Sequence, residues 1–143
     1  MQTTITDNLK LVERAWVDSI NRRSQEDFLD LHGESVALYD PTLGSLKGRP
    51  ALDKMWKGLF RMFPDYQIRK VRSFGQEDWV CLEVEESGTM RGPIHAGPRE
   101  IPLTGKSFKI PSSIIARIDH GRIGEVRIYF DVLGLMAQLG LGP

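Results

Sequence analysis

Apolar positions follow two different periods along this chain, and the change of period predicts where helices give way to strands. Up to about residue 63, apolar side chains recur at helical spacing, which is typical of helices with one buried face. Three helices are predicted there, one running to about Asn21, one over Gln25–His32 and one over Pro50–Phe63. A short strand, Glu34–Tyr39, is expected between the second and the third.

The residues at the helix starts support this assignment. Thr6 or Asp7 is expected to cap the first helix, and Ser24 with Asp27 three positions later resembles a capping box for the second. Pro50 falls in the first turn of the third helix, where its missing N–H costs nothing.

Beyond residue 64 the apolar positions alternate with polar ones, as in strands with one buried face. Gly121 supplies the positive φ needed by the turn of the second hairpin. An apolar segment, Val132–Leu141, follows that hairpin as a short helical plug. Four strands are predicted: Tyr66–Phe74, Trp79–Ser87, Lys106–Asp119 and Gly124–Asp131.

Helices followed by consecutive antiparallel strands indicate an α+β fold. We expect one domain over residues 1–143, a cone-shaped barrel in which a curved antiparallel sheet carries the three helices on its concave face. The segment Met90–Gly105 is rich in glycine and proline and is expected to be irregular, with a possible role as a lid left open.

Charge and composition exclude several classes of function. The 143 residues include 19 basic and 19 acidic side chains, so no overall field favours nucleic acid or an anionic membrane. The terminal apolar segment is shorter than the roughly 20 residues that span a bilayer. The N-terminus lacks a signal-peptide pattern, and the single cysteine, Cys81, suits a reducing compartment, so a cytoplasmic protein is expected.

No cofactor or metal is expected. The chain contains no glycine-rich nucleotide-binding motif and no nucleophile-elbow motif. The three histidines, His32, His95 and His120, lack the clustered spacing of a zinc site.

Three local motifs carry a resemblance to a known family. They are Tyr39-Asp40-Pro41 followed by Gly48-Arg49-Pro50-Ala51, the segment Ile101–Lys106, and Asp131–Leu135 with Gln138–Gly140. With the order of elements, they resemble the SnoaL-like polyketide cyclases, which share a superfamily with nuclear transport factor, ketosteroid isomerase and limonene epoxide hydrolase. The resemblance implies a homodimer and a pocket between helices and sheet.

The chain departs from that family at its usual acid/base positions. The cyclase aspartate on the last strand corresponds to Ile128, and the cyclase histidine or isomerase aspartate on the preceding strand corresponds to Ile114. The isomerase tyrosine of the first helix corresponds roughly to Trp16. Asp40 is retained and matches the position of the isomerase base.

Asp40 and His95 are therefore the catalytic candidates. Buried among apolar side chains, Asp40 would be a stronger base, which suits proton abstraction from carbon. The alternative is a turn residue that accepts local N–H groups and faces water. His95 could be a second acid/base group or a surface loop residue. Asp131 could belong to the site, but it also fits a helix cap.

Strand alternation and helix spacing predict a largely apolar substrate-binding pocket. Such walls suit a flat hydrophobic small molecule such as a polyketide, steroid or terpenoid. The aromatic and methionine side chains of the helices could equally be core. The predicted lining is Trp16, Tyr39, Met55, Trp56, Leu82, Ser112, Ile114, Ile128 and Phe130.

Three functions remain open from the sequence. The first is a cofactor-independent cyclase or isomerase in which Asp40 moves the proton. The second is a pocket that binds an apolar ligand, or guides its closure by shape, without acid/base help. The third is a dimeric interaction module that uses the outer sheet face, which would carry Ser113, Ile115, Arg117, Arg127 and Tyr129.

Overall fold

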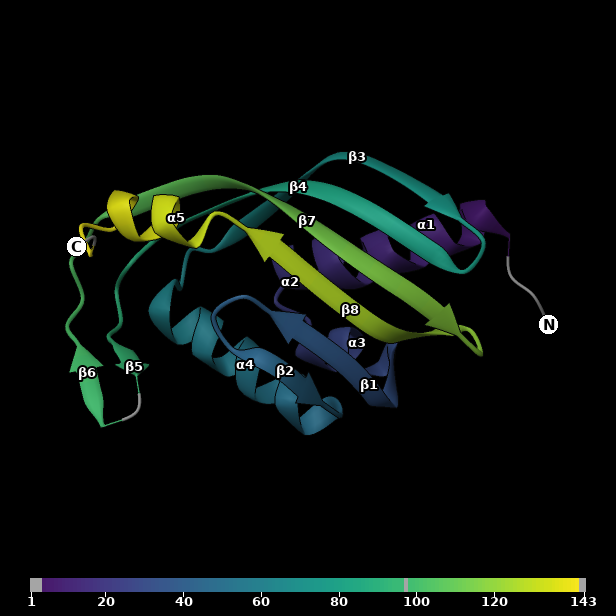
Figure 1. Cartoon of the computed structure of the whole chain (residues 1–143), viewed down its shortest axis with the longest axis horizontal. Helices are drawn as coiled ribbons and strands as arrows, with labels where there is room; N and C mark the ends of the chain where they lie inside the picture. Colours follow the sequence, from purple (N-terminus) through teal and green to yellow (C-terminus); the bar gives the residue numbers. More distant parts are fainter. Residues whose placement is uncertain (1–3, 97, 142–143) are drawn as a thin grey trace.

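The predicted α+β architecture is confirmed by the fold of the chain (Figure 1). The computed structural model describes residues 4–96 and 98–141, with the side chains of residues 95 and 96 left out. One curved sheet of six strands carries the N-terminal helices on its concave face, and it does not close into a full barrel.

The first predicted helix is continuous but not uniform. A π-helical turn, η1 (Arg14–Asp18), lies between α1 (Ile5–Glu13) and α2 (Ser19–Asn21). The cap is Thr4, whose Oγ1 accepts the N–H of Asp7 at 3.0 Å, so the expected caps Thr6 and Asp7 were placed too late. Thr4 is the better cap because its extended backbone turns the side chain back onto the first turn.

The other two N-terminal helices are α3 (Gln25–Asp30) and α4 (Arg49–Met62). Ser24 precedes α3 as predicted, but its side chain makes no capping hydrogen bond, so the capping box is wrong. Asp27 binds two arginines and a serine instead. The prediction for Pro50 is confirmed, since it lies in the first turn of α4.

The sheet is mixed, with strand order β2-β1-β8-β7-β4-β3. Strand β1 runs parallel to β8, whereas the other neighbouring pairs in this sheet are antiparallel. The wholly antiparallel sheet expected from the sequence is therefore corrected at one pair. The strands are β1 (His32–Asp40), β2 (Gly44–Lys47), β3 (Gln67–Gln76), β4 (Trp79–Thr89), β7 (Ser107–Asp119) and β8 (Arg122–Phe130).

The β7–β8 hairpin closes through a two-residue turn. Its central residues, His120 and Gly121, have φ of 52° and 75°. A turn with positive φ at both positions matches the right-handed twist of the flanking strands, which is why glycine is needed there.

The segment expected to be irregular contains a small second sheet. Strands β5 (Ile94–Ala96) and β6 (Arg99–Ile101) pair antiparallel and project from one end of the molecule (Figure 1). The N–H groups of Arg91 and Gly92 both donate to the carbonyl of Met62, which ties this segment to the end of α4.

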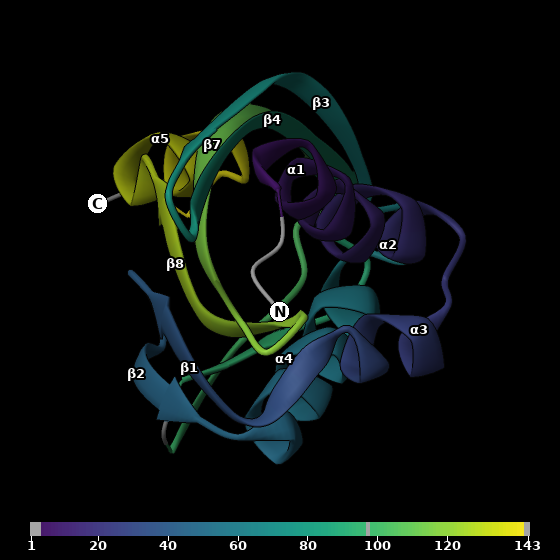
Figure 2. The ribbon, with the colours of Figure 1, turned by 90° about the vertical axis from the view of Figure 1, so that its right-hand side faces the viewer.

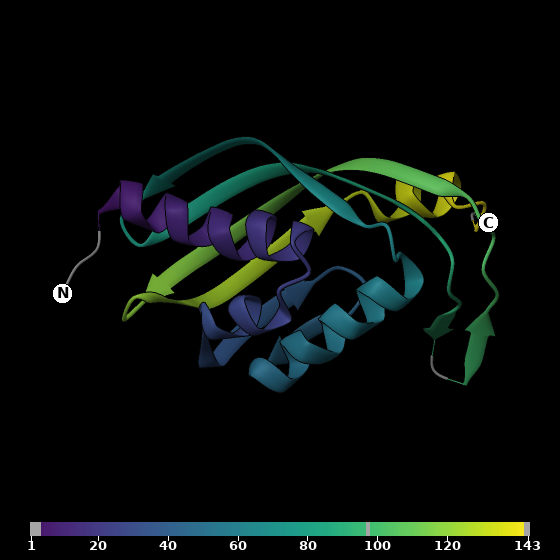
Figure 3. The ribbon, with the colours of Figure 1, turned by 180° about the vertical axis from the view of Figure 1, so that it is seen from behind.

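The core lies between the helices and the concave face of the sheet. Strands β3, β4, β7 and β8 curl around α1 in the end-on view (Figure 2), and the view from behind shows α1 and α4 on the inner side (Figure 3). The C-terminal plug is α5 (Val132–Gln138), which packs beside β7. Asp131 caps it, because its Oδ1 accepts the N–H of Gly134 at 2.8 Å.

Candidate functional site

The concave face of the sheet is apolar over most of its area. Ile114 of β7 and Ile128 of β8 are direct partners in the sheet, and both are buried. The two positions that the resemblance matched to acid/base residues of the SnoaL-like cyclases are therefore occupied by isoleucines that pack against each other. The inward side chains of the central strands are Val80, Leu82, Val84, Ser112, Ile114, Ala116, Val126 and Ile128.

Asp40 is the last residue of β1 and is only 8% exposed. Alternation along β1 places it on the same face as the buried Val36 and Leu38. Its Oδ1 accepts three hydrogen bonds, from the N–H of Thr42 at 2.7 Å, from the Thr42 hydroxyl at 2.5 Å and from the N–H of Leu43 at 3.2 Å.

The surroundings of Asp40 bear on its two sequence interpretations, and its catalytic role stays a prediction. Asp40 is a turn residue that accepts local N–H groups, but it is not in bulk water. The three donors fix the orientation of the carboxyl group. Among the described residues, Oδ2 accepts no hydrogen bond, so this oxygen can take a proton.

A second carboxyl group, Glu86 of β4, shares this interior and was missed by the sequence reasoning. The hydroxyl of the buried Tyr66 donates to its Oε1. Burial raises the pKa of Glu86, hydrogen bonds from Tyr66 and Ser112 lower it, and the charge of Asp40 raises it further, with a net rise. Burial likewise raises the pKa of Tyr66 well above its ordinary range, and the charges of Glu86 and Asp40 add to the rise.

Ser112 of β7 is the third polar group of this set. It is buried, and its hydroxyl donates to the carbonyl of Tyr129 at 3.3 Å. A hydroxyl has one hydrogen, so Ser112 divides it between this carbonyl and Glu86, whose pKa it lowers. We call Asp40, Tyr66, Glu86 and Ser112 the inner polar cluster.

A signal for Glu86 was present in the sequence. Val80, Leu82 and Val84 alternate inward along β4, and the next inward position is Glu86. Tyr66 precedes the inward Ile68 by two residues and so continues the same face. Following both alternations by one further step would have placed both side chains on the inner face, although not in contact.

Tyr39 does not line the interior and is corrected. Alternation turns it to the outer face, where its ring lies 5.6 Å from that of Tyr129 and 4.8 Å from the guanidinium of Arg127. Phe130, at the end of β8, is half-buried and packs against the core.

The tryptophans predicted to line the pocket belong to an aromatic core. Trp16 and Trp56 both pack against Phe28. Their ring centroids lie 5.0 and 5.1 Å, respectively, from the centroid of the Phe28 ring. The Trp16 indole N–H donates to Nε2 of His32 at 3.1 Å, so it is not aimed at a ligand. Met55 of α4 is half-buried and packs against the core.

The position of the His95 side chain lies outside the described part of the chain. Its backbone belongs to β5 and pairs with Glu100. It stays a predicted acid/base candidate.

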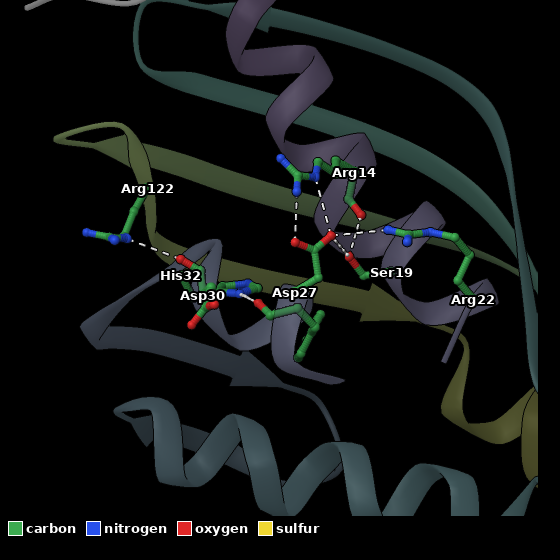
Figure 4. Close-up of polar contacts among 8 residues, drawn as sticks. Arg14, Ser19, Arg22, Asp27, Asp30, His32 and Arg122 are labelled. Carbon is green, nitrogen blue, oxygen red and sulfur yellow. Dashed lines mark hydrogen bonds and ion pairs between the residues drawn. The ribbon is translucent and has the colours of Figure 1, made fainter. Parts of the chain in front are cut away.

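A separate ionic cluster joins the N-terminal helices and lies apart from the inner polar cluster. Asp27 binds Arg14 at 2.8 Å and Arg22 at 3.1 Å, and the Ser19 hydroxyl donates to it at 3.3 Å (Figure 4). The arginines lower the pKa of Asp27 although burial opposes this. These contacts hold the helices together.

Two surface hollows accompany the fold. One, of about 500 Å³, includes Arg69, Glu85 and Lys109, and the other, of about 320 Å³, includes Arg14 and Asp27. Neither is lined by a member of the inner polar cluster.

The described part of the chain contains neither a cluster of metal-ligating side chains nor a membrane-spanning helix. No group of three or more histidine, cysteine, aspartate or glutamate side chains there is placed to hold a metal ion. None of the helices described has the length and hydropathy needed to cross a bilayer.

The curved mixed sheet with helices on its concave face is the cone fold of ketosteroid isomerase-like and NTF2-like proteins. A sequence model of the SnoaL-like polyketide cyclase family matches residues 10–139. The chain belongs to this family, as the resemblance of its motifs indicated. A comparison with curated proteins finds no match.

Solved structures with this fold are similar over nearly the whole chain. A SnoaL-like protein from Jannaschia sp. CCS1 is 17% identical with a TM-score of 0.84, and the match covers 100% of this chain and 99% of that one. A ketosteroid isomerase-like fold from Catenulispora acidiphila is 16% identical (TM-score 0.75; 96% and 95% covered). An epoxide hydrolase of the LEH-like type from M. tuberculosis is 15% identical (TM-score 0.72; 96% and 92% covered). At these identities the likeness concerns the fold.

Proposed function

We propose that this protein is a cofactor-independent enzyme of cyclase or isomerase type that acts on a hydrophobic small molecule, with Asp40 as the acid/base group. The observation that carries the proposal is the buried Asp40 carboxylate, whose Oδ1 is held by Thr42 and Leu43 while Oδ2 accepts no hydrogen bond from the described residues. Membership of the cyclase family supports the reaction class.

The surroundings of Asp40 suit an apolar substrate. Leu82, Ile114 and Ile128 are buried apolar side chains on the same concave face, and Ser112 is a buried polar one. Met55 and Met62 of α4 are half-buried, and methionine side chains adapt to irregular ligands. Such a site holds a polyketide, steroid or terpenoid near its reactive conformation, which contributes to the rate. The single cysteine, Cys81, agrees with a cytoplasmic location.

The test compares Asp40→Asn with the wild type on two substrates. One is a β,γ-unsaturated ketosteroid, whose double-bond shift is followed by absorbance, and the other is an aromatic polyketide ester, whose ring closure is followed by chromatography. Asparagine keeps an oxygen for the Thr42 and Leu43 donors, so the turn persists. We expect turnover of at least one substrate, reduced at least about tenfold in the variant.

Asp78→Asn is the matched control, because Asp78 is an exposed aspartate in the β3–β4 turn. It should leave turnover unchanged. Equal turnover by Asp40→Asn and wild type would remove Asp40 from the mechanism.

A second candidate is a pocket that binds an apolar ligand without acid/base help. The isoleucine pair Ile114 and Ile128, at the family's usual acid/base positions, favours it. Native mass spectrometry that finds a co-purified ligand leaving chemically unaltered supports this alternative, and a protein that carries and binds none argues against it.

The proposed partner is a second copy of the chain. The outer face of β1, β7 and β8 carries Tyr39, Arg127 and the 41% exposed Tyr129 in mutual contact. Tyrosine and arginine are enriched in protein interfaces, which supports this face as the dimer surface.

A further inference from the structure

The larger of the two surface hollows described above combines several basic side chains with few acidic ones. It has a volume of about 500 Å³ and extends from the end of α2, across the edge strand β3, to the start of β7. Among the described residues that line it, Arg23, Arg69 and Lys109 are basic and Glu85 is acidic. The hollow therefore carries an excess of positive charge.

The register of three neighbouring strands brings most of these side chains together. Gln67 of β3, Ser87 of β4 and Lys109 of β7 are successive partners across the sheet, and Arg69 and Glu85 are partners in the next row. Partners in register share a face, and so do residues two apart on one strand. All five side chains consequently stand on the outer face, placed by paired strands.

The ion pairs of the hollow leave its charge unbalanced. Nη2 of Arg69 and Nζ of Lys109 both approach Oε1 of Glu85, at 3.3 and 3.6 Å. One carboxylate thus serves two cations. The neighbouring pair on the same strands, Arg72 with Glu83 at 3.0 Å, is one to one. The excess of positive charge is therefore a property of the hollow, not of the whole outer face.

Arg23 adds a fixed cation at the edge of the hollow. It follows α2 with a φ of 60°, at a place where glycine is usual. Its guanidinium donates to the carbonyls of Ile20 at 2.9 Å and Pro64 at 3.0 Å, and lies 4.4 Å from the centroid of the Phe60 ring. A guanidinium has more N–H donors than these two bonds use, so donors remain for a ligand.

The hollow also holds two neutral donors that are not in use. Among the described residues, neither the amide of Gln67 nor the hydroxyl of Ser87 forms a hydrogen bond. The amide of Asn21, by contrast, is used, because it bonds the N–H and the carbonyl of Ile68 at 3.0 and 2.7 Å. Asn21 thereby fixes the edge of β3 beside the free donors.

We propose that this hollow binds a small polar phosphate ester, such as a sugar phosphate. Arginine and lysine both bind phosphate oxygens through charge-assisted hydrogen bonds. The cations come from three different elements, which suits a tetrahedral group with oxygens in several directions better than a planar carboxylate. The site lies apart from Asp40, and the inference goes beyond the proposed function.

The size and the lining of the hollow indicate an ester and not the free ion. Small-molecule sites usually have about 300–1,000 Å³, and a phosphate group alone fills only a small part of this hollow. Its one apolar lining residue, Ile68, is buried at 3% exposure, so the rest of the ligand meets polar side chains. A sugar has hydroxyl groups for such partners.

The alternative is a solvated surface with ordinary ion pairs, which bind nothing and contribute little to stability. The first experiment titrates the full chain with glucose 6-phosphate at constant ionic strength and follows the backbone amide signals by NMR. We expect the signals of Gln67, Ser87 and Lys109 to shift, and to stay in place with glucose. Absence of these shifts would overturn the proposal. Affinity for succinate or inorganic phosphate equal to that for glucose 6-phosphate would overturn the assignment of a phosphate ester.

The second experiment removes one cation at a time. Arg69→Gln should weaken the binding of glucose 6-phosphate at least about fivefold, since a charge-assisted contact is lost. Arg72→Gln is the matched control, because it also removes one charge from β3 and one ion pair with β4, but outside the hollow. It should bind as the wild type does. Equal weakening by both variants would mean that only the overall charge matters, and would refute a site.

The third experiment predicts a gain of affinity. Glu85 competes with the ligand for Arg69 and Lys109, so Glu85→Gln should strengthen the binding of glucose 6-phosphate at least about threefold. Glu83→Gln changes the net charge equally and should have no effect. A hollow without a ligand site shows no difference between these two variants, and that result would end the proposal.

Discussion

His32 is a buried histidine with both ring nitrogens in use. Its Nε2 accepts the indole N–H of Trp16 at 3.1 Å, so Nδ1 carries the hydrogen and donates to the carbonyl of Phe28 at 2.7 Å. The neutral ring is therefore the form that fits. Burial, together with the charge of Arg49, lowers its pKa to about 4, although the contact with Phe28 opposes this.

This histidine should make the fold acid-sensitive. Between its folded pKa of about 4 and its unfolded pKa of 6.5, the unfolded chain binds a proton that the folded chain excludes, so stability falls as the pH falls. From pH 7 to pH 5 we expect the wild type to lose about 2 kcal/mol through His32. Chemical denaturation of wild type and His32→Gln at both pH values measures it.

The comparison with His32→Gln is needed because Glu86 acts in the opposite sense. Its raised pKa destabilises the folded state as the pH rises, so it offsets part of the loss. The stability of His32→Gln should respond less to acid by the amount that His32 contributes. His120→Gln, at a 95% exposed side chain, is the control and should behave as wild type. Equal losses in His32→Gln and wild type would show that His32 does not titrate as argued.

At the level of single residues, the sequence predicted positions better than environments. Alternation and the Asp-Pro turn placed Asp40 at the end of a strand, but not the three donors on Oδ1, which come from the path of the following turn. The contact between Tyr66 and Glu86 joins residues 20 positions apart and depends on the register of β3 with β4. No local pattern gives such a register.

At the level of elements, one glycine permits the contact between the β5–β6 segment and α4. A Cβ added at Gly92 would lie 2.2 Å from the carbonyl oxygen of Arg61, which is backbone and cannot move aside easily. The close approach allows Arg91 and Gly92 to donate to the Met62 carbonyl at the end of α4. This carbonyl is otherwise one of the orphan acceptors of a helix C-terminus.

Gly92→Ala should therefore loosen this contact and destabilise the protein by about 1–3 kcal/mol. Gly58→Ala is the matched control. It lies inside α4, and the nearest atom to its added Cβ is Arg61 Nη2 at 4.0 Å, so alanine should stabilise the helix by about 0.5–1 kcal/mol. Urea denaturation of both variants measures the two signs, and a Gly92→Ala variant as stable as wild type would contradict the argument.

The elements predicted well are those with a strong local signal. The long helices and the two long hairpins carry periodic apolar positions, and the turn at Gly121 carries its own glycine. Strand β2 was missed because Gly44–Lys47 is too short for a period to be seen. The β5–β6 pair was missed because each strand has three residues among glycines and prolines.

At the scale of the whole molecule, the outer sheet face is the surface through which we propose that two copies of the chain associate. Arg127 contacts both tyrosines there, with its guanidinium 4.8 Å from the ring of Tyr39 and 5.8 Å from that of Tyr129. This arrangement presents a preorganised aromatic surface. In a twofold dimer each residue of this surface contributes twice.

Tyr129→Lys should weaken the proposed dimer at least about tenfold, because it places a charge beside Arg127 and removes a ring. Phe74→Lys is the control, since Phe74 is exposed on the distant edge strand β3. Sedimentation velocity at micromolar concentration is the measurement. A wild type that sediments as a monomer would exclude this role for the face.

The parallel pairing of β1 with β8 sets a condition on biosynthesis. Leu38 of β1 finds its sheet partner Val126 only after the ribosome has synthesised the chain past Val126, since 88 positions separate the two in the sequence. Until then one edge of β1 has no strand beside it, and the end of β1 that carries Asp40 has no fixed place in the sheet. Closing such a long loop is slow compared with forming local hairpins, so the site is assembled late. A nascent chain truncated before Arg122 would expose that edge to other chains, which makes premature termination in this gene a route to aggregation rather than to a partly active fragment.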